Sequence, residues 1–125
     1  MNKLIMYLED DEMLREGIVF GFMETNYDIV DFPDGYEAIK YLENEENKKP
    51  DIYITDISMP GMDGITFIKE LHKRDIHKPI IVISGYSNED YKEELESLGV
   101  AKIILKGDSE ELIESVDLLI SHLEA

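Results

Sequence analysis

The chain has 125 residues, which fits one domain and is long enough to bury a core. Its 29 acidic residues against 12 Lys and Arg give a formal net charge of -17, which disfavours direct contact with nucleic-acid phosphates. The sequence has no cysteine for disulfides or thiolate metal sites, no apolar run near the roughly 20 residues of a membrane span, and no signal-peptide pattern at its start. We therefore expect one cytoplasmic domain over residues 1–125.

The predicted elements alternate between two patterns along the chain. Short, nearly continuous apolar runs rich in Ile are typical of parallel strands that are covered on both faces. They fall at residues 3–8, 27–32, 52–55, 80–84 and 101–105. The segments between them are amphipathic and predict helices.

Each predicted helix is identified by a stripe of mostly apolar side chains. The first stripe comprises Met13, Leu14, Gly17, Ile18, Phe20, Gly21 and Phe22. The second comprises Tyr36, Ile39, Lys40 and Leu42, and the third Ile65, Phe67, Ile68 and Leu71. The fourth comprises Tyr91, Leu95 and Leu98, and the fifth Leu112, Ile113, Val116, Leu119, Ile120 and Leu123. Residues 87–90 and 108–111 predict caps for the last two helices, Gly99 predicts the stop of the fourth, and the polar residues 43–50 predict a loop.

Five strands that alternate with five helices predict an α/β fold with a parallel sheet and right-handed crossovers. For five such units the leading topology is a flavodoxin-like doubly wound (βα)5 sandwich with strand order 2-1-3-4-5. Ligands of these folds bind at the carboxyl ends of the strands, near the point where the strand order reverses. In this order that point lies between the first and third strands.

Acidic side chains follow both of these strands. The first predicted strand runs into Glu9, Asp10 and Asp11, and the third runs into Asp56. Carboxylates that converge in this way repel one another unless a cation offsets their charge. Mg²⁺ prefers oxygen ligands and is often held by one or two carboxylates with waters and phosphate oxygens. The pattern therefore favours a magnesium site over solvated loop acids.

A hydroxyl and a lysine follow the last two strands. Ser84 ends the fourth strand and can donate to a phosphoryl oxygen, while Lys106 follows the fifth and can pair with a carboxylate or a phosphoryl group. Together with the acids they suit phosphoryl transfer to a carboxylate, with Asp56 as the nucleophile. The loop that follows Asp56 contains Pro60, Gly61 and Gly64, which predicts a tight turn beside the site.

Over essentially its whole length the chain resembles the receiver domain of bacterial two-component response regulators. The resemblance is carried by residues 4–11 with Arg15 six positions after Glu9, by residues 50–64, by residues 79–85, and by Lys106. It implies a phosphorelay module in which Asp56 accepts a phosphoryl group from a sensor histidine kinase or a histidine phosphotransfer protein. On this resemblance the module would catalyse its own phosphorylation and dephosphorylation and would act as a signalling protein, not as an enzyme.

The same resemblance assigns roles within the site. Asp10 and Asp56 would bind Mg²⁺ directly, Glu9 through water, and Ser58 through its backbone carbonyl. Ser84 would be the switch hydroxyl. Residues 58 and 86 occupy the positions where such domains tune their dephosphorylation rates.

Two positions depart from the family pattern. Gly107 follows the lysine where the family usually has proline, which disfavours a cis peptide bond there and leaves the loop freer to move. Ile103 stands where the family often has Tyr or Phe, so a coupled switch of Ser84 and an aromatic ring cannot operate in its usual form. These departures leave the readout of the signal open.

Other functions on the same architecture stay open as alternatives. A pseudo-receiver would act as an interaction module without phosphorylation. A flavodoxin-like flavin binder would need a hydroxyl- or Gly-rich loop after the first strand, and a haloacid-dehalogenase-type phosphatase would need an acid where Ser58 stands. The sequence leaves open the downstream target and whether the receiver stands alone or belongs to a larger regulator. We expect a monomer before phosphorylation.

Overall fold

The computed structural model describes residues 2–85, 89–107 and 109–124. Its strands are β1 (Leu4–Leu8), β2 (Asp28–Phe32), β3 (Ile52–Asp56), β4 (Ile80–Ser84) and β5 (Lys102–Leu105). Its helices are α1 (Glu12–Phe22), α2 (Gly35–Glu43), α3 (Gly64–Lys73), α4 (Glu89–Ser97) and α5 (Ser109–Glu124). The five predicted strands are therefore confirmed to within one residue at each end, as is the loop after α2.

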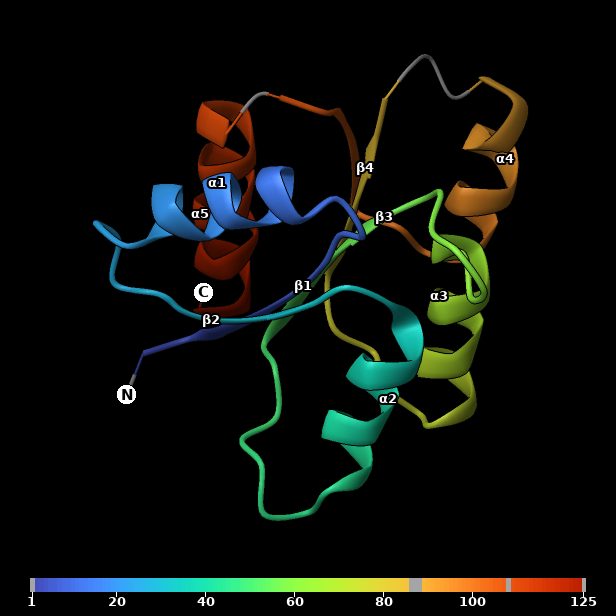
Figure 1. Cartoon of the computed structure of the whole chain (residues 1–125), viewed down its shortest axis with the longest axis horizontal. Helices are drawn as coiled ribbons and strands as arrows, with labels where there is room; N and C mark the ends of the chain where they lie inside the picture. Colours follow the sequence, from blue (N-terminus) through green and yellow to red (C-terminus); the bar gives the residue numbers. More distant parts are fainter. Residues whose placement is uncertain (1, 86–88, 108, 125) are drawn as a thin grey trace.

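All the strands are parallel and lie in the order β2-β1-β3-β4-β5, which confirms the predicted flavodoxin-like topology. Helices α1 and α5 cover one face of the sheet, and α2, α3 and α4 cover the other (Figure 1). Strands β1, β3 and β4 are buried along their whole length. Their alternate side chains feed two core clusters, one on each face, which explains why these strands are apolar at nearly every position.

The inward face of α1 differs from the predicted stripe. Met13 is 83% exposed and Phe20 is 74% exposed, so the prediction that both line the core is wrong. The helix instead turns Ile18, Val19 and Phe22 toward the sheet. Apolar side chains on several sides of α1 are compatible with more than one rotation of the helix about its axis. The contacts of Arg15 with Glu9 and Asp31 favour the rotation that is observed.

The stripes of the other helices are confirmed for most of their apolar members. The exceptions are the exposed side chains Tyr36, Tyr91 and Leu123. Asp11, Asp34 and Asp63 cap α1, α2 and α3, each by accepting a hydrogen bond from a backbone amide of the first turn. Gly99, two residues after the end of α4, takes a φ of +81°, as predicted for a helix stop. The caps predicted at Ser87, Asn88 and Asp108 lie outside the described residues.

Among the described residues, no helix combines the length and the apolar character that crossing a bilayer requires. The carboxyl ends of β1 and β3 lie side by side at one rim of the sheet, with β4 next to them. The fold therefore brings together the strand ends at which the sequence predicts the acidic and polar residues of a site.

Candidate functional site

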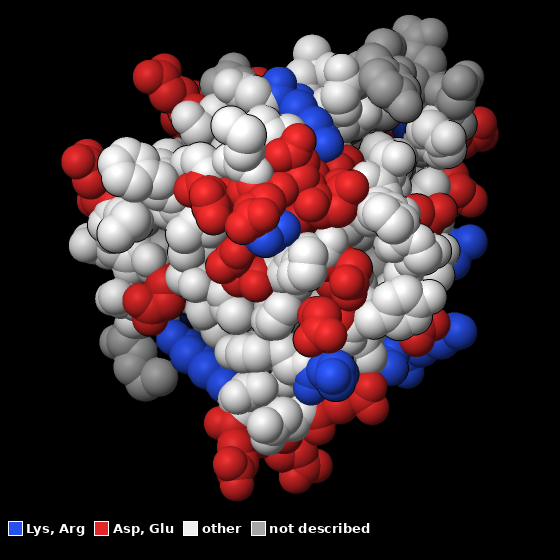
Figure 2. Space-filling model, in the orientation of Figure 1, with Lys and Arg blue, Asp and Glu red and all other residues white. Residues whose placement is uncertain are grey.

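Three carboxylates meet where β1 and β3 end. Leu8 pairs with Thr55 in the parallel register, so Glu9 and Asp56 continue from neighbouring positions of adjacent strands. Ligand oxygens of Glu9, Asp10 and Asp56 lie within 4.8 Å of one another. Figure 2 shows acidic side chains gathered on the face that carries these strand ends. The predicted convergence of the two acidic segments is confirmed, and Asp11 takes a different role as the cap of α1.

Lys106 reaches this cluster from the end of β5. Its Nζ lies 2.6 Å from Asp56 Oδ2 and 3.2 Å from Glu9 Oε1. Its backbone N–H also donates to the Ser84 carbonyl at 2.7 Å. Lys106 is therefore held in the site although Gly107, with a φ of +94°, stands where the family usually has proline. No described peptide bond is cis.

Two buried carboxylate oxygens of the cluster lack a directed hydrogen bond. Glu9 and Asp56 are each only 1% exposed. The backbone N–H of Ser58 donates to Asp56 Oδ1 at 3.2 Å, but Asp56 Oδ2 and Glu9 Oε1 meet the Lys106 ammonium only at ion-pair distance, without hydrogen-bond geometry. Buried acceptors of this kind are costly unless a cation completes their coordination. The donor set of carboxylate oxygens suits a hard divalent ion.

The environment of Glu9 shifts its protonation strongly. Burial raises the pKa of the Glu9 carboxyl to about 7, and the nearby Asp56 carboxylate adds to the rise, while the Asp11 amide and Lys106 oppose it. Lys106 shows the reverse balance: burial disfavours its charge, but its contacts with Asp56 and Glu9 outweigh this and raise its pKa. The cluster therefore gathers charges that its own residues only partly neutralise.

Glu9→Gln should stabilise the metal-free protein at alkaline but not at acidic pH. The folded protein holds a proton on Glu9 that the unfolded chain releases above its ordinary pKa of 4.5. The contribution of protonated Glu9 to the free energy of unfolding of the wild type is thus lost as the pH rises from about 4.5 to about 7. We expect the variant to gain on the order of 1–3 kcal/mol at pH 8 and almost nothing near pH 5, measured by urea unfolding in a chelator.

Glu70→Gln is the control for that measurement. Hydrogen bonds from Arg74 and Lys73 lower the pKa of Glu70, so its removal should slightly destabilise the protein at neutral pH. An equal gain from both substitutions would mean that net charge alone, and not burial at the cluster, causes the effect.

Arg15 orients the β1 end of the site. Its guanidinium donates to the Glu9 carbonyl at 2.7 Å and pairs with Asp31 at 3.1 Å. These contacts turn the Arg15 face of α1 inward and set the rotation of the helix. The six-residue spacing from Glu9 is the sequence signal that points to this contact.

The remaining predicted site residues lie on the same rim. Ser84 ends β4 and is fully buried, and Ser58 follows Asp56 by two residues and is exposed. Ile103 is half-buried against the core face that α2, α3 and α4 cover. Residue 86 lies outside the described residues. Tyr7, which no sequence argument singled out, lies on β1 two residues before Glu9. Burial raises the pKa of its hydroxyl, and the nearby Glu9 and Asp56 carboxylates add to the rise.

The fold and the acidic rim together define a class of signalling protein. Residues 5–117 match the model of the response regulator receiver domain. The chain belongs to this family, and it is a receiver domain of two-component response regulators.

Similar proteins agree with this assignment. The transcriptional regulatory protein PdtaR of Mycobacterium tuberculosis is 32% identical over 94% of this chain and 57% of its own length. The transcriptional regulatory protein PhoP of Bacillus subtilis is 32% identical over 71% of this chain and 36% of its own length. The chain thus spans less than two thirds of these relatives.

Solved structures carry the same fold. The receiver domain of the Francisella response regulator 1452 has a TM-score of 0.87 and 28% identity, and the comparison covers 98% of this chain and 99% of that one. A CheY-like receiver domain from Methanospirillum hungatei has a TM-score of 0.89 over 99% of this chain and 98% of its own, at 19% identity.

Proposed function

We propose that this receiver domain accepts a phosphoryl group on Asp56 in a Mg²⁺-dependent reaction and thereby switches the binding of a protein partner. The observation that carries the proposal is the buried Asp56 carboxylate, which lies 2.6 Å from Lys106 and within 4.8 Å of the Glu9 and Asp10 oxygens. A phosphorylation-independent module would have no need to bury this costly arrangement.

In the proposed reaction an Asp56 carboxylate oxygen attacks the phosphorus atom of a phosphohistidine. The new P–O bond forms as the P–N bond breaks, and the imidazole leaves with the electron pair. No separate base is needed because an ionised carboxylate is already nucleophilic. Lys106 offsets charge on the transferring group, and the Ser58 amide orients the carboxylate through its bond to Oδ1.

The residues that would hold Mg²⁺ are Asp10 and Asp56 directly, Glu9 through water, and the Ser58 backbone carbonyl. The buried acceptors Glu9 Oε1 and Asp56 Oδ2 support this assignment. When bound, the ion supplies positive charge beside the phosphoryl oxygens. Ser84, buried at the end of the neighbouring strand β4, would act as the switch hydroxyl that donates to the phosphoryl group.

The donor we propose is a sensor histidine kinase or a histidine phosphotransfer protein in the cytoplasm. The exposed apolar side chains of α1, Met13 and Phe20, lie on the helix that begins just after the acidic cluster, and they offer a contact surface for a donor protein. A monomeric receiver that acts as a signalling module and not as a turnover enzyme suits this role. With Ile103 in place of an aromatic ring, the output would depend on Ser84 and on Lys106.

Wild-type protein incubated with acetyl phosphate and Mg²⁺ should gain a single phosphoryl adduct in intact-mass spectrometry. Without Mg²⁺ the adduct should be almost absent. Borohydride reduction of the adduct followed by peptide mapping should place the modification at residue 56. An adduct at another residue, or equal labelling in excess chelator, would contradict the proposal.

A further inference from the structure

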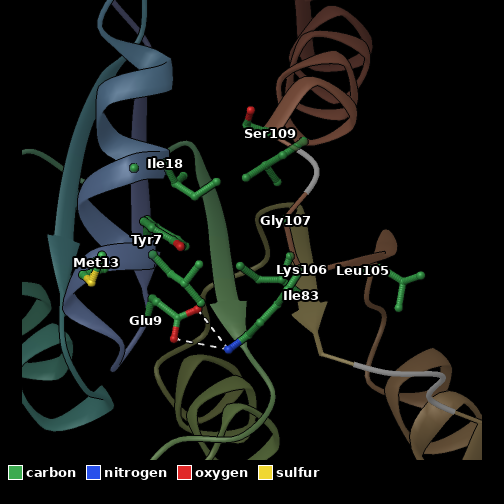
Figure 3. A pocket seen from close by; sticks show the side chains of 12 residues that line it. Tyr7, Glu9, Met13, Ile18, Ile83, Leu105, Lys106, Gly107 and Ser109 are labelled. Carbon is green, nitrogen blue, oxygen red and sulfur yellow. Dashed lines mark hydrogen bonds and ion pairs between the residues drawn. The ribbon is translucent and has the colours of Figure 1, made fainter.

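A pocket of about 260 Å³ lies beside the phosphorylation site, between α1 and the start of α5. Its walls are mostly apolar and include Leu14, Ile18 and Leu112, while Glu9 and Lys106 border it on the side of the acidic cluster (Figure 3). The pocket is somewhat smaller than typical drug-sized sites but exceeds the roughly 150 Å³ that suffices for benzene. It therefore has room for a single-ring molecule.

Two glycines keep this space open. A Cβ added at Gly17, in the middle of α1, would meet no atom within 4 Å, and the same holds for Gly107. Both residues line the pocket. Glycine in a helix interior costs about 1 kcal/mol relative to alanine, so Gly17 leaves room at the expense of helix stability.

Tyr7 places a hydroxyl on the pocket wall, away from the charged groups at its border. Its side chain is 1% exposed, and its hydroxyl is turned into the space between α1 and the segment after β5 (Figure 3). The hydroxyl borders the pocket, where it can donate a hydrogen bond to an acceptor of a bound molecule.

We propose that this pocket binds a small neutral molecule that has a ring-sized apolar body and one hydrogen-bond acceptor directed at the Tyr7 hydroxyl. A charged ligand fits less well, because the walls are mostly apolar and the Glu9 and Lys106 charges at the border are already paired with each other. The net charge of -17 further disfavours an anion.

Occupation of the pocket has a consequence for the neighbouring chemistry. Lys106 and Gly107 belong both to its wall and to the segment that brings the ammonium to Asp56. A bound molecule restricts this segment, so it should change the lifetime of the aspartyl phosphate; this second effect rests on the proposed function.

The binding test uses para-fluoroacetophenone as a probe, followed by fluorine NMR on unphosphorylated protein without Mg²⁺ or phosphodonor. Its carbonyl is the acceptor and its ring is the apolar body. We expect saturable binding with a Kd on the order of 1 mM. Removing the hydroxyl with Tyr7→Phe should weaken binding roughly 3- to 10-fold. Filling the space with Gly17→Leu should abolish it.

Matched variants separate the pocket from general effects. Tyr53→Phe removes the hydroxyl of another buried tyrosine, on the opposite core face, and Gly21→Ala raises the helix propensity of α1 outside the pocket wall. Both should bind the probe like wild type. Absence of saturable binding to wild type, or binding that survives Gly17→Leu, would overturn the pocket as a ligand site.

The coupling is measured separately as the decay of the phosphoryl adduct with and without saturating probe. A lifetime changed at least twofold in wild type, and unchanged in Gly17→Leu, supports it. An unaltered lifetime in wild type overturns the coupling while the binding result stands. Failure of phosphorylation itself would appear as absence of the adduct and would leave the NMR measurement unaffected.

Discussion

Asp56→Asn should abolish the phosphoryl adduct that acetyl phosphate and Mg²⁺ produce on the wild-type protein. The amide lacks the negative charge of the nucleophile, and its nitrogen is not a metal ligand, so both labelling and Mg²⁺ affinity should fall. We expect labelling below a hundredth of the wild-type level by intact-mass spectrometry, and Mg²⁺ binding at least tenfold weaker by titration calorimetry. The Ser58 amide can still donate to the remaining carbonyl oxygen, so the fold should persist.

Asp63→Asn is the matched control for this experiment. Asp63 lies in the same β3–α3 loop but caps α3, where its Oδ1 accepts a hydrogen bond from the Thr66 amide at 2.8 Å. Asparagine caps helices almost as well as aspartate, so labelling should stay at the wild-type level. An undiminished adduct on Asp56→Asn would show that another carboxylate is the acceptor.

Gly64→Ala should destabilise the domain by about 2–4 kcal/mol. A Cβ at this first residue of α3 would lie 2.3 Å from the Asp56 carbonyl oxygen and 2.9 Å from the Ile57 Cα. These are backbone atoms, so relief requires the strand end or the helix to move. The Gly64 amide also donates to the Ile57 carbonyl at 3.0 Å, which ties the loop closed at the same point. Urea unfolding followed by circular dichroism measures the loss.

Gly17→Ala is the same change on α1, where the added methyl meets no atom within 4 Å. It should stabilise the domain by up to about 1 kcal/mol, because alanine is the better helix former. If Gly64→Ala matched this gain, the contact between α3 and the end of β3 would not be as tight as the structure has it. Loss of stability at Gly64 should also weaken labelling, since the Asp56 backbone must shift.

The sequence was sufficient for most of the fold and for the residues of the acidic cluster. Buried parallel strands are apolar on both faces, so the runs that became β1, β3 and β4 were unambiguous. The topology then followed from five alternating units, and the convergence of Glu9, Asp10 and Asp56 followed from the topology.

Two features could not be predicted from the sequence: the rotation of α1 about its axis and the pocket beside Tyr7. Met13 and Phe20 fit an apolar stripe as well as Ile18 does, and only the contacts of Arg15 with Glu9 and Asp31 show which side of α1 turns inward. No sequence pattern predicts the pocket beside Tyr7, because it depends on the absence of side chains at Gly17 and Gly107. The expectation that Gly107 leaves the loop freer to move did not take into account the ion pairs of Lys106 with Glu9 and Asp56.

The position of Lys106 also matters for the margin of the sheet. Strand β5 is an outer strand of only four residues, with Ile104 its one fully buried side chain, and it has a partner on one side alone. The ammonium of Lys106, directly after the strand, holds its end through ion pairs with Glu9 and Asp56, which lie at the ends of β1 and β3. The charge state of the acidic cluster therefore also affects how firmly this edge strand is held. Amide hydrogen exchange along β5 would report, from outside the cluster, whether the ion pairs of Lys106 are formed.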